Sequence, residues 1–222
     1  VLITCTSYRH LVQDGTFLLT KVNESPVITL FLYYVLPRSF TTFCFQYLCN
    51  KVNYVVRKSL ENAVQMEYKA LTDDMTGAYN KNRLIELLNN RERDGQDIAV
   101  IYWDVNQLKY VNDNWGHLCG DRLITEVAKT IQSIAREEDI VIRYGGDEFL
   151  LYVANGTKEI AEQLIKTWKV RLEEEKKREN YEFPVSASVG YALGKHSQLK
   201  DIIAAADKDM YANKRICRES AK

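Results

Sequence analysis

Apolar residues from position 72 onward follow two alternating periods, one typical of strands and one typical of helices. Residues 98–103 (IAVIYW) form an uninterrupted apolar run, as expected for a strand that is buried on both faces. Between residues 123 and 134, apolar residues recur at spacings of three and four, which predicts a helix with one buried face. Residues 140–144 and 149–153 flank Gly145 and Gly146, and this arrangement predicts a β-hairpin with a glycine turn.

The remainder of this region continues the alternation. We expect helices over residues 82–90, 157–178 and 201–215, and a strand over residues 185–192. The charged run EEEKKRE near the end of the second of these helices is interpreted as a solvated face. The order of elements predicts one α/β (α+β) domain over residues 72–222, with a mixed central sheet flanked by helices.

The first 71 residues differ from the rest of the chain in their pattern of apolar residues. Three β-like runs cover residues 1–6, 16–22 and 27–36, and Pro37 ends the last of them. A helix running to Leu71 follows, with one apolar stripe that we expect to be buried: Leu48, Val52, Val56, Leu60 and Ala63. This helix either packs on its own domain or pairs with its copy in a second chain.

A membrane span over residues 26–50 is the alternative for part of this region, because the stretch is long and rich in Phe, Tyr and Leu. However, Pro37 and Arg38 lie at its midpoint, and an Arg at the centre of a bilayer costs about 2.5–3.5 kcal/mol on insertion scales. A soluble hairpin followed by a helix is favoured, and no membrane association is expected for this part of the chain.

Composition and charge narrow the class of protein. The 222 residues carry 30 Lys and Arg against 30 Asp and Glu, and 46% are hydrophobic, so wholesale disorder is excluded. A formal charge of zero argues against general nucleic-acid binding, which needs a positive field. The three histidines are scattered, no CxxC occurs, and no signal-peptide pattern follows Val1. We therefore expect reduced thiols and a cytoplasmic protein whose N-terminus is truncated.

Three carboxylates stand where two predicted strands can meet. Asp104 directly follows the buried run, and Asp147 and Glu148 follow the glycine turn. Carboxylates that converge raise one another's pKa unless a cation neutralises them, and oxygen ligands suit Mg²⁺ or Mn²⁺. Because glycines let a backbone approach a phosphate closely, the spacing suggests phosphoryl or nucleotidyl transfer. A plain surface hairpin with acidic residues at its tip is the alternative.

Five ordered blocks resemble the GGDEF family of diguanylate cyclases. The signature itself is RYGGDEF over residues 143–149, and the match extends over residues 72–222. TDDMTGAYN at 72–80 resembles the family's TDxLTGLxN segment. DVNQLKYVND at 104–113 and GHLCGD at 116–121 resemble its DxDxFKxxND and GHxxGD blocks. SVG at 188–190 and ADKDMYANK at 206–214 resemble its SxG and ADxAMYxAK segments. The resemblance implies a fold like the polymerase palm and the nucleotidyl cyclases, in a bacterial protein.

The resemblance also implies residue roles. Asp104 and Glu148 would hold Mg²⁺ or Mn²⁺ with the carbonyl of Val105, and Asp147 would lie beside them. Gly145 and Gly146 would belong to the catalytic turn, and the phosphates would be neutralised by Lys109, Arg143 and Lys214. Asn112 and Asp121 would read the guanine base, and Leu108 and His117 would also bind the substrate. Helix capping is the alternative for Asn112 and Asp121. The implied substrate is GTP, and the implied product is cyclic di-GMP, made by a homodimer.

Arg136 and Asp139 enclose the segment REED, which is separated from Gly145 by five residues, and they match the family's RxxD inhibitory site, which binds the product; Arg218 matches a further arginine of that site. Within the DxDxFKxxND block, two positions depart from the family pattern, since Asn106 replaces an Asp and Leu108 replaces a Phe. These departures put the rate of the reaction in doubt more than its chemistry.

Residues 1–71 resemble the last third of a GAF sensory domain leading into an output helix, on the order of elements and on residues 36–41 (LPRSFT). A PAS-like remnant and a membrane end are the alternatives. For the whole chain, the hypotheses are an active diguanylate cyclase, a non-catalytic cyclic di-GMP receptor, and a cyclase of altered base specificity.

Overall fold

The computed structural model describes residues 31–220, with the side chains of 32, 33 and 216–220 left aside. The chain divides into a unit that ends at Val64 and a unit that begins at Gln65. The predicted strands over residues 1–6 and 16–22 lie outside the described residues. The GAF-like likeness of the N-terminal part depends mainly on those strands, and no described residue supports it.

The described part of the first unit is helical. A short π-helix, η1 (Phe31–Val35), leads into the 36-residue helix α4 (Leu36–Leu71), so the prediction of a strand over 27–36 is wrong for residues 31–36. Pro37 is the second residue of α4, within a helical run that starts at Phe31. It therefore lies inside helical structure and does not end a strand. None of the described helices is both long enough and apolar enough to cross a membrane.

The predicted helix over residues 48–71 is confirmed, but its apolar stripe is not buried. Helix α4 has no buried residue, and Leu48, Val52, Val56 and Leu60 are 51–62% exposed. The prediction of a buried stripe is therefore wrong within the described chain. Periodicity identified the helix correctly because it depends on local spacing, whereas burial depends on a partner surface.

A four-stranded sheet forms the centre of the second unit. Its strands are β1 (Asp97–Val105), β2 (Ile140–Arg143), β3 (Glu148–Ala154) and β4 (Ala187–Lys195), in the order β2-β3-β1-β4. All three ladders are antiparallel, so the sheet is antiparallel and not mixed as predicted; the parallel bridge between Tyr79 and Ile142 is isolated and adds no strand to it. The predicted hairpin around Gly145 and Gly146 is confirmed as β2-β3.

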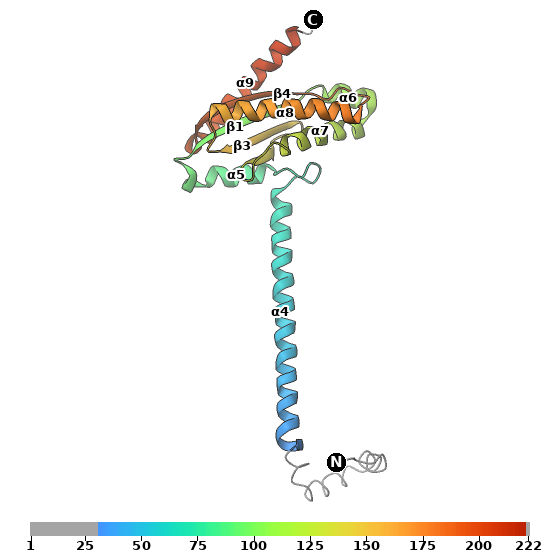
Figure 1. Cartoon of the computed structure of the whole chain (residues 1–222), viewed down its shortest axis with the longest axis vertical. Coiled ribbons are helices and arrows are strands. Elements are labelled where there is room, and N and C mark those ends of the chain that lie inside the picture. Colours follow the sequence, from blue (N-terminus) through green and yellow to red (C-terminus); the bar gives the residue numbers. More distant parts are fainter. Residues whose placement is uncertain (1–30, 221–222) are drawn as a thin grey trace, which may run out of the picture. The chain divides into compact units, whose positions relative to one another are not determined.

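Helices cover both faces of the sheet (Figure 1). One face packs against α6 (Leu108–Trp115), α7 (His117–Gln132) and α8 (Lys158–Glu179). The other packs against α5 (Lys81–Asn89) and α9 (Leu199–Ser220), with η2 (Arg91–Arg93) and η3 (His196–Gln198) as short turns. Strand β1 is central, so Ile101 and Trp103 enter one core while Val100 and Tyr102 enter the other. The predicted α/β architecture, and the strand buried on both faces, are confirmed.

Candidate active site

Two of the three predicted carboxylates face each other. Asp104 near the end of β1 is paired in register with Glu148 at the start of β3, and with Ser188 of β4 on its other side. Directly paired residues of antiparallel strands carry their side chains on the same face, so the Asp104 and Glu148 carboxylates share one face of the sheet. The predicted meeting of the β1 end with the glycine hairpin is therefore confirmed.

Asp147 does not complete a three-carboxylate cluster. Among residues 31–220 no group of three His, Cys, Asp or Glu side chains is close enough to hold a metal ion. Asp147 lies in the turn, just before β3 begins at Glu148, and so is not part of the ladder that pairs Asp104 with Glu148. The backbone of Asp147 contributes instead, since its carbonyl accepts a hydrogen bond from Val105 N–H at 2.9 Å.

The first glycine of the signature makes room for Glu148. A Cβ added at Gly145 would overlap Oε2 of the Glu148 side chain, whereas one at Gly146 would meet nothing. The N–H groups of Tyr144 and Gly145 both donate to the Glu148 carbonyl, at 2.8 and 3.2 Å. The turn therefore folds back on Glu148 and holds its carboxylate beside the backbone.

Lys214 of α9 neutralises the other carboxylate. Its ammonium lies 2.5 Å from Asp104 Oδ1, and the two side chains are only 16% and 19% exposed. The sequence predicted a phosphate-binding role for Lys214, and in the structure its contact is with the predicted metal ligand. Asp104, Glu148 and the Val105 carbonyl are all oxygen donors, so this set fits Mg²⁺ or Mn²⁺, which bind carboxylates together with substrate phosphates.

Tyr102 lies on the same face, one position back from Asp104 on that side of β1. Burial raises its pKa, and so does the neighbouring Glu148 carboxylate. Its ring also meets Tyr144 edge to face, with centroids 5.9 Å apart. The phenol therefore stays protonated at neutral pH and is available as a hydrogen-bond donor beside Glu148.

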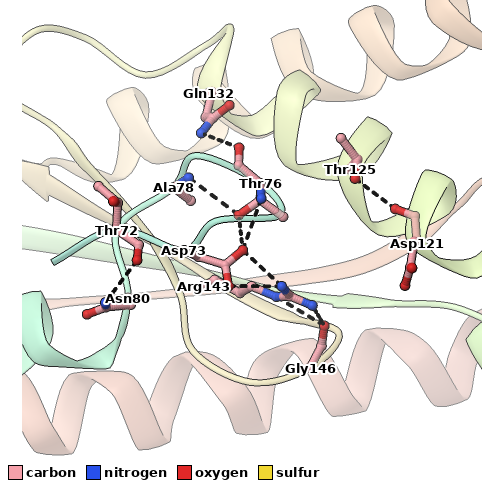
Figure 2. Close-up of polar contacts among 10 residues, drawn as sticks. All are labelled: Thr72, Asp73, Thr76, Ala78, Asn80, Asp121, Thr125, Gln132, Arg143 and Gly146. Atoms are coloured by element: carbon pink, nitrogen blue, oxygen red, sulfur yellow. Dashed lines mark hydrogen bonds and ion pairs between the residues drawn. The ribbon is translucent and has the colours of Figure 1, made fainter. Parts of the chain in front are cut away.

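The Arg143 guanidinium binds both Asp73 and the glycine turn (Figure 2). Its Nη1 lies 2.9 and 3.0 Å from the two carboxylate oxygens of Asp73, and its Nη2 donates to the Gly146 carbonyl at 2.7 Å. Burial alone would raise the pKa of Asp73, but hydrogen bonds from Thr76 and Arg143 outweigh it and lower the pKa. Arg143 thus links the signature to the TDDMTGAYN block, a structural role that the sequence reasoning did not assign to Asp73.

The loop over residues 72–80 is held from both sides (Figure 2). Thr76 donates its N–H and its hydroxyl to Asp73 Oδ1, at 3.0 and 2.7 Å, and Gln132 at the end of α7 donates to the Thr76 carbonyl at 3.3 Å. Tyr79 exchanges backbone hydrogen bonds with Val141 and Arg143 of β2, at 2.9 and 2.7 Å. The first block therefore braces the hairpin that carries the signature.

The predicted guanine-reading residues lie on a helical hairpin. Asn112 is inside α6 and Asp121 inside α7, so neither is an N-cap; those positions are taken by Gln107, in a left-handed conformation, and Gly116. A Cβ on Gly120 would overlap the Asn112 amide, so Gly120 lets the two helices approach there. Asp121 is exposed, and its backbone carbonyl accepts from the Thr125 hydroxyl at 2.8 Å (Figure 2).

The other residues of this predicted substrate site differ in their exposure to solvent. Lys109 and His117 are exposed at the starts of α6 and α7, while Leu108 packs partly buried against the core. Asn106 accepts a hydrogen bond from the Ser188 hydroxyl at 2.9 Å, which ties the first position after Val105 to β4. A hollow of about 480 Å³ borders Arg143, Gly145 and Gly146, and one of about 600 Å³ borders Asn106 and Ser188; neither is lined by Asp104 or Glu148.

Arg136 and Asp139 satisfy each other. Asp139 Oδ2 accepts from the N–H and Nε of Arg136 at 3.0 and 2.9 Å, and Oδ1 accepts from Arg136 Nη2 at 2.8 Å and from Ala154 N–H at 3.3 Å. The Asp139 side chain has no exposed surface, while that of Arg136 is 33% exposed. Hydrogen bonding to Asp139 raises the pKa of Arg136. In this arrangement a ligand can reach the arginine but not the aspartate; the side chain of Arg218 lies outside the described set.

Comparisons with known proteins agree with this geometry. Residues 70–220 match the family described as "Diguanylate cyclase, GGDEF domain". The "Probable diguanylate cyclase DgcJ" of Escherichia coli is 33% identical over 167 residues, which cover 70% of this chain and 33% of that protein. The "Cyclic di-GMP phosphodiesterase PdeR" of the same species is 34% identical over 149 residues, covering 65% of this chain and 22% of that protein.

A solved structure of the coiled coil and GGDEF domain of DgcB from Caulobacter crescentus, in complex with c-di-GMP, has a TM-score of 0.65. It is 25% identical to this chain and covers 77% of it and 94% of its own length. The chain spans about a third or less of the two curated relatives named above. The family model matches well over half of the chain, so the chain belongs to the GGDEF diguanylate cyclase domain family.

Proposed function

We propose that this chain is a diguanylate cyclase that condenses two GTP into cyclic di-GMP and two pyrophosphates. The observation that carries the proposal is the direct pairing of Asp104 with Glu148 across β1 and β3, at the foot of an intact GGDEF turn. Relatives named as diguanylate cyclases, such as DgcJ, support the same reaction.

In the proposed reaction, the 3′-hydroxyl oxygen of each GTP bonds to the α-phosphorus of the other. The bond from that phosphorus to the β-phosphate oxygen breaks, pyrophosphate leaves, and the hydroxyl proton passes to solvent. Asp104, Glu148 and the Val105 carbonyl would hold Mg²⁺ or Mn²⁺, which neutralises the triphosphate and lowers the pKa of the attacking hydroxyl. Lys214 would exchange Asp104 for a phosphate when the cation binds, while Lys109 would contact phosphate from α6.

Asn112 and Asp121 would select the base. A carboxylate accepts from the N1–H and 2-amino groups of guanine, and an amide can donate to O6. Adenine lacks that pair of donors, so ATP would leave the exposed Asp121 without a partner. Leu108 and His117 would border the same base, and Gly145 and Gly146 would let the turn approach a phosphate.

A homodimer would bring the two half-sites together. Helix α4 exposes Leu48, Val52, Val56 and Leu60 at spacings of four, and a helix with such a stripe gains free energy by burying it against a second helix. Val56→Asp should therefore shift sedimentation toward a monomer and lower turnover, while the exposed polar control Asn53→Asp should do neither. A dimeric Val56→Asp protein with normal turnover would exclude this role of α4.

Product inhibition would act through Arg136, whose guanidinium keeps an exposed part beside the buried Asp139. An Arg fork can grip a phosphate or the Hoogsteen edge of guanine. Arg136→Lys keeps the charge but loses the fork, so we expect it to weaken cyclic di-GMP binding about ten-fold or more. Equal binding of the product by both proteins would exclude this site.

The deciding experiment incubates the chain with Mg²⁺ and GTP, ATP or both, and resolves the products. Cyclic di-GMP from GTP alone is the expected result. The name of PdeR keeps a second function in view, because a domain of this family also occurs in a protein named as a phosphodiesterase. A dimeric sample that binds cyclic di-GMP but makes none would identify a non-catalytic receptor, and mixed products with ATP would identify altered base specificity.

A further inference from the structure

Helix α9 is fastened to the outer edge of β4 by two side chains. Strand β4 is the last strand of the order β2-β3-β1-β4, so within residues 31–220 the backbone groups that point away from β1 have no neighbouring strand. Asp209 Oδ2 accepts from the N–H of Tyr191 at 3.0 Å, and Asn213 Nδ2 donates to the carbonyl of Val189 at 3.1 Å. Residues four apart lie one turn apart on the same side of a helix, so together they grip two successive outward-facing residues of the strand.

Gly190 lies between Val189 and Tyr191 and allows the backbones of α9 and β4 to approach each other closely. A Cβ on Gly190 would overlap the backbone N and Cα of Met210 and the carbonyl carbon of Asp209. The helix backbone therefore lies directly on the strand backbone at this point. Asp209, Asn213 and Gly190 form one attachment, which we call the α9 clamp.

The α9 clamp lies next to the candidate active site. Lys214 follows Asn213 in sequence and contacts Asp104 at 2.5 Å. On the strand side, Ser188 precedes the gripped Val189 and is the β4 residue paired with Asp104. Two consecutive residues of α9 thus make contacts to different strands: Asn213 binds the edge of β4, and Lys214 binds Asp104 of β1.

The two clamp side chains differ from the residues at the same positions of the ADxAMYxAK pattern. Positions 209 and 213 carry alanine in that pattern, whereas this chain has Asp209 and Asn213. Alanine can neither accept from Tyr191 N–H nor donate to Val189. The clamp is therefore an addition to the segment, and its removal returns the helix to a composition compatible with the fold.

We propose that Asp209 and Asn213 are positioning residues that hold Lys214 in the active site and so set the affinity for GTP. The inference rests on the proposed function for its GTP readout, but the placement of Lys214 can be tested without nucleotide. A long lysine side chain has many rotamers, and fixing its Cα at a constant distance from Asp104 reduces the ordering that a contact requires.

The first test measures amine labelling of Lys214 in the whole chain by mass spectrometry, with the exposed Lys208 of the same helix as internal reference. Asp209→Ala and Asn213→Ala should each raise the labelling rate of Lys214 about two- to twelve-fold, the range expected for loss of one net hydrogen bond. Asp209→Asn should label as wild type, because an amide oxygen can still accept from Tyr191 N–H. Unchanged labelling in both alanine variants would overturn the proposal.

The second test is a double-mutant cycle on GTP affinity, measured by titration calorimetry. Asn213→Ala should weaken GTP about two- to twelve-fold in the wild-type background and less than two-fold in a Lys214→Ala background, because the clamp acts through Lys214. Equal losses in both backgrounds would show a merely structural role and overturn the proposal. If the wild type binds no GTP, the proposed function fails, and labelling alone decides the inference.

Discussion

Two ion pairs that the sequence placed in ligand-binding sites differ in how completely they are closed. Lys214 and Asp104 share one contact between helix α9 and strand β1, and neither side chain is fully buried. Arg136 and Asp139 share three hydrogen bonds, a fourth comes from Ala154, and Asp139 has no exposed surface. Arg136 also donates to the Ala154 carbonyl at 2.8 Å.

The two pairs differ in whether their partners can be exchanged for ligands. A single charge-assisted contact between two partly exposed groups can be replaced by a metal ion on one side and a phosphate on the other without leaving a buried charge behind. Removing a partner from a buried, multiply bonded pair does leave one, and the loss is then of fold stability. We therefore interpret the Asp104 pair as an exchangeable contact of the active site, and the Arg136 pair as a brace at the end of β3 that exposes only its arginine.

The largest effect that tests the exchangeable pair comes from Asp104 itself. Asp104→Ala removes a metal ligand, and we expect cyclic di-GMP formation to fall about a thousand-fold or more, equivalent to about 4 kcal/mol of transition-state stabilisation. Initial rates of product formation at saturating GTP measure it. The matched control is Asp147→Ala, whose carboxylate is not among the ligands proposed for the metal ion, and its loss should be much smaller. Equal losses at both positions would break the distinction between the two carboxylates.

The closed pair should respond in stability. Arg136→Ala leaves the Asp139 carboxylate buried without its cation, so we expect the free energy of unfolding to fall by about 3 kcal/mol. Urea denaturation followed by circular dichroism measures the change, with Arg122→Ala, from an ion pair to Glu179 that is half exposed on the arginine side, as the control. A stable Arg136→Ala protein would contradict the brace. Its loss of stability also means that inhibition by product is better tested with Arg136→Lys.

How far the sequence predicts these pairs depends on how local they are. The hairpin, the run of β1 and helix α7 depend on periodicity and turn residues within a short stretch, and all three were predicted correctly. The pairing of Asp104 with Glu148 followed from the expectation that β1 and β3 are neighbours.

The contacts that the sequence did not predict are those fixed by distant backbone. Lys214 lies 110 residues from Asp104, and Asp139 is buried by its contact with Ala154, 15 residues further on. The RxxD spacing identifies the two partners but does not show that the Asp139 carboxylate would use its hydrogen-bonding capacity on Arg136 and Ala154. In the same way, the periodicity of α4 predicted a helix, while the exposure of Leu48 and Val52 depends on whether a second surface covers them.

Lys214→Ala sharpens the contrast with Arg136→Ala, since an exchangeable contact should matter for ligand and little for fold. We expect GTP affinity to fall by about 2 kcal/mol, within the range for a hydrogen bond to a charged group, which is roughly thirty-fold. The free energy of unfolding should change by less than about 1 kcal/mol, as for other partly exposed pairs. Calorimetric titration with GTP and urea denaturation of the same samples give both quantities. A variant that loses stability while GTP affinity is unchanged would reverse our assignment of the two pairs.

Asp73 and Arg143 form an intermediate pair, partly buried at 24% and 13% exposure, and its contribution should depend on pH. Hydrogen bonds from Thr76 and Arg143 overcome the effect of burial and hold the pKa of Asp73 below its ordinary value of 3.8. A carboxyl whose folded pKa is lowered stabilises the fold above its unfolded pKa, and this stabilisation disappears as the pH falls through the folded pKa. The difference in unfolding free energy between wild type and Asp73→Asn should therefore be about 1 kcal/mol at pH 7 and decline below pH 3.8. Asp74→Asn, at the exposed neighbouring position, should show no such difference; a pH-independent loss in Asp73→Asn would indicate that lost packing, and not the charge, stabilises the loop.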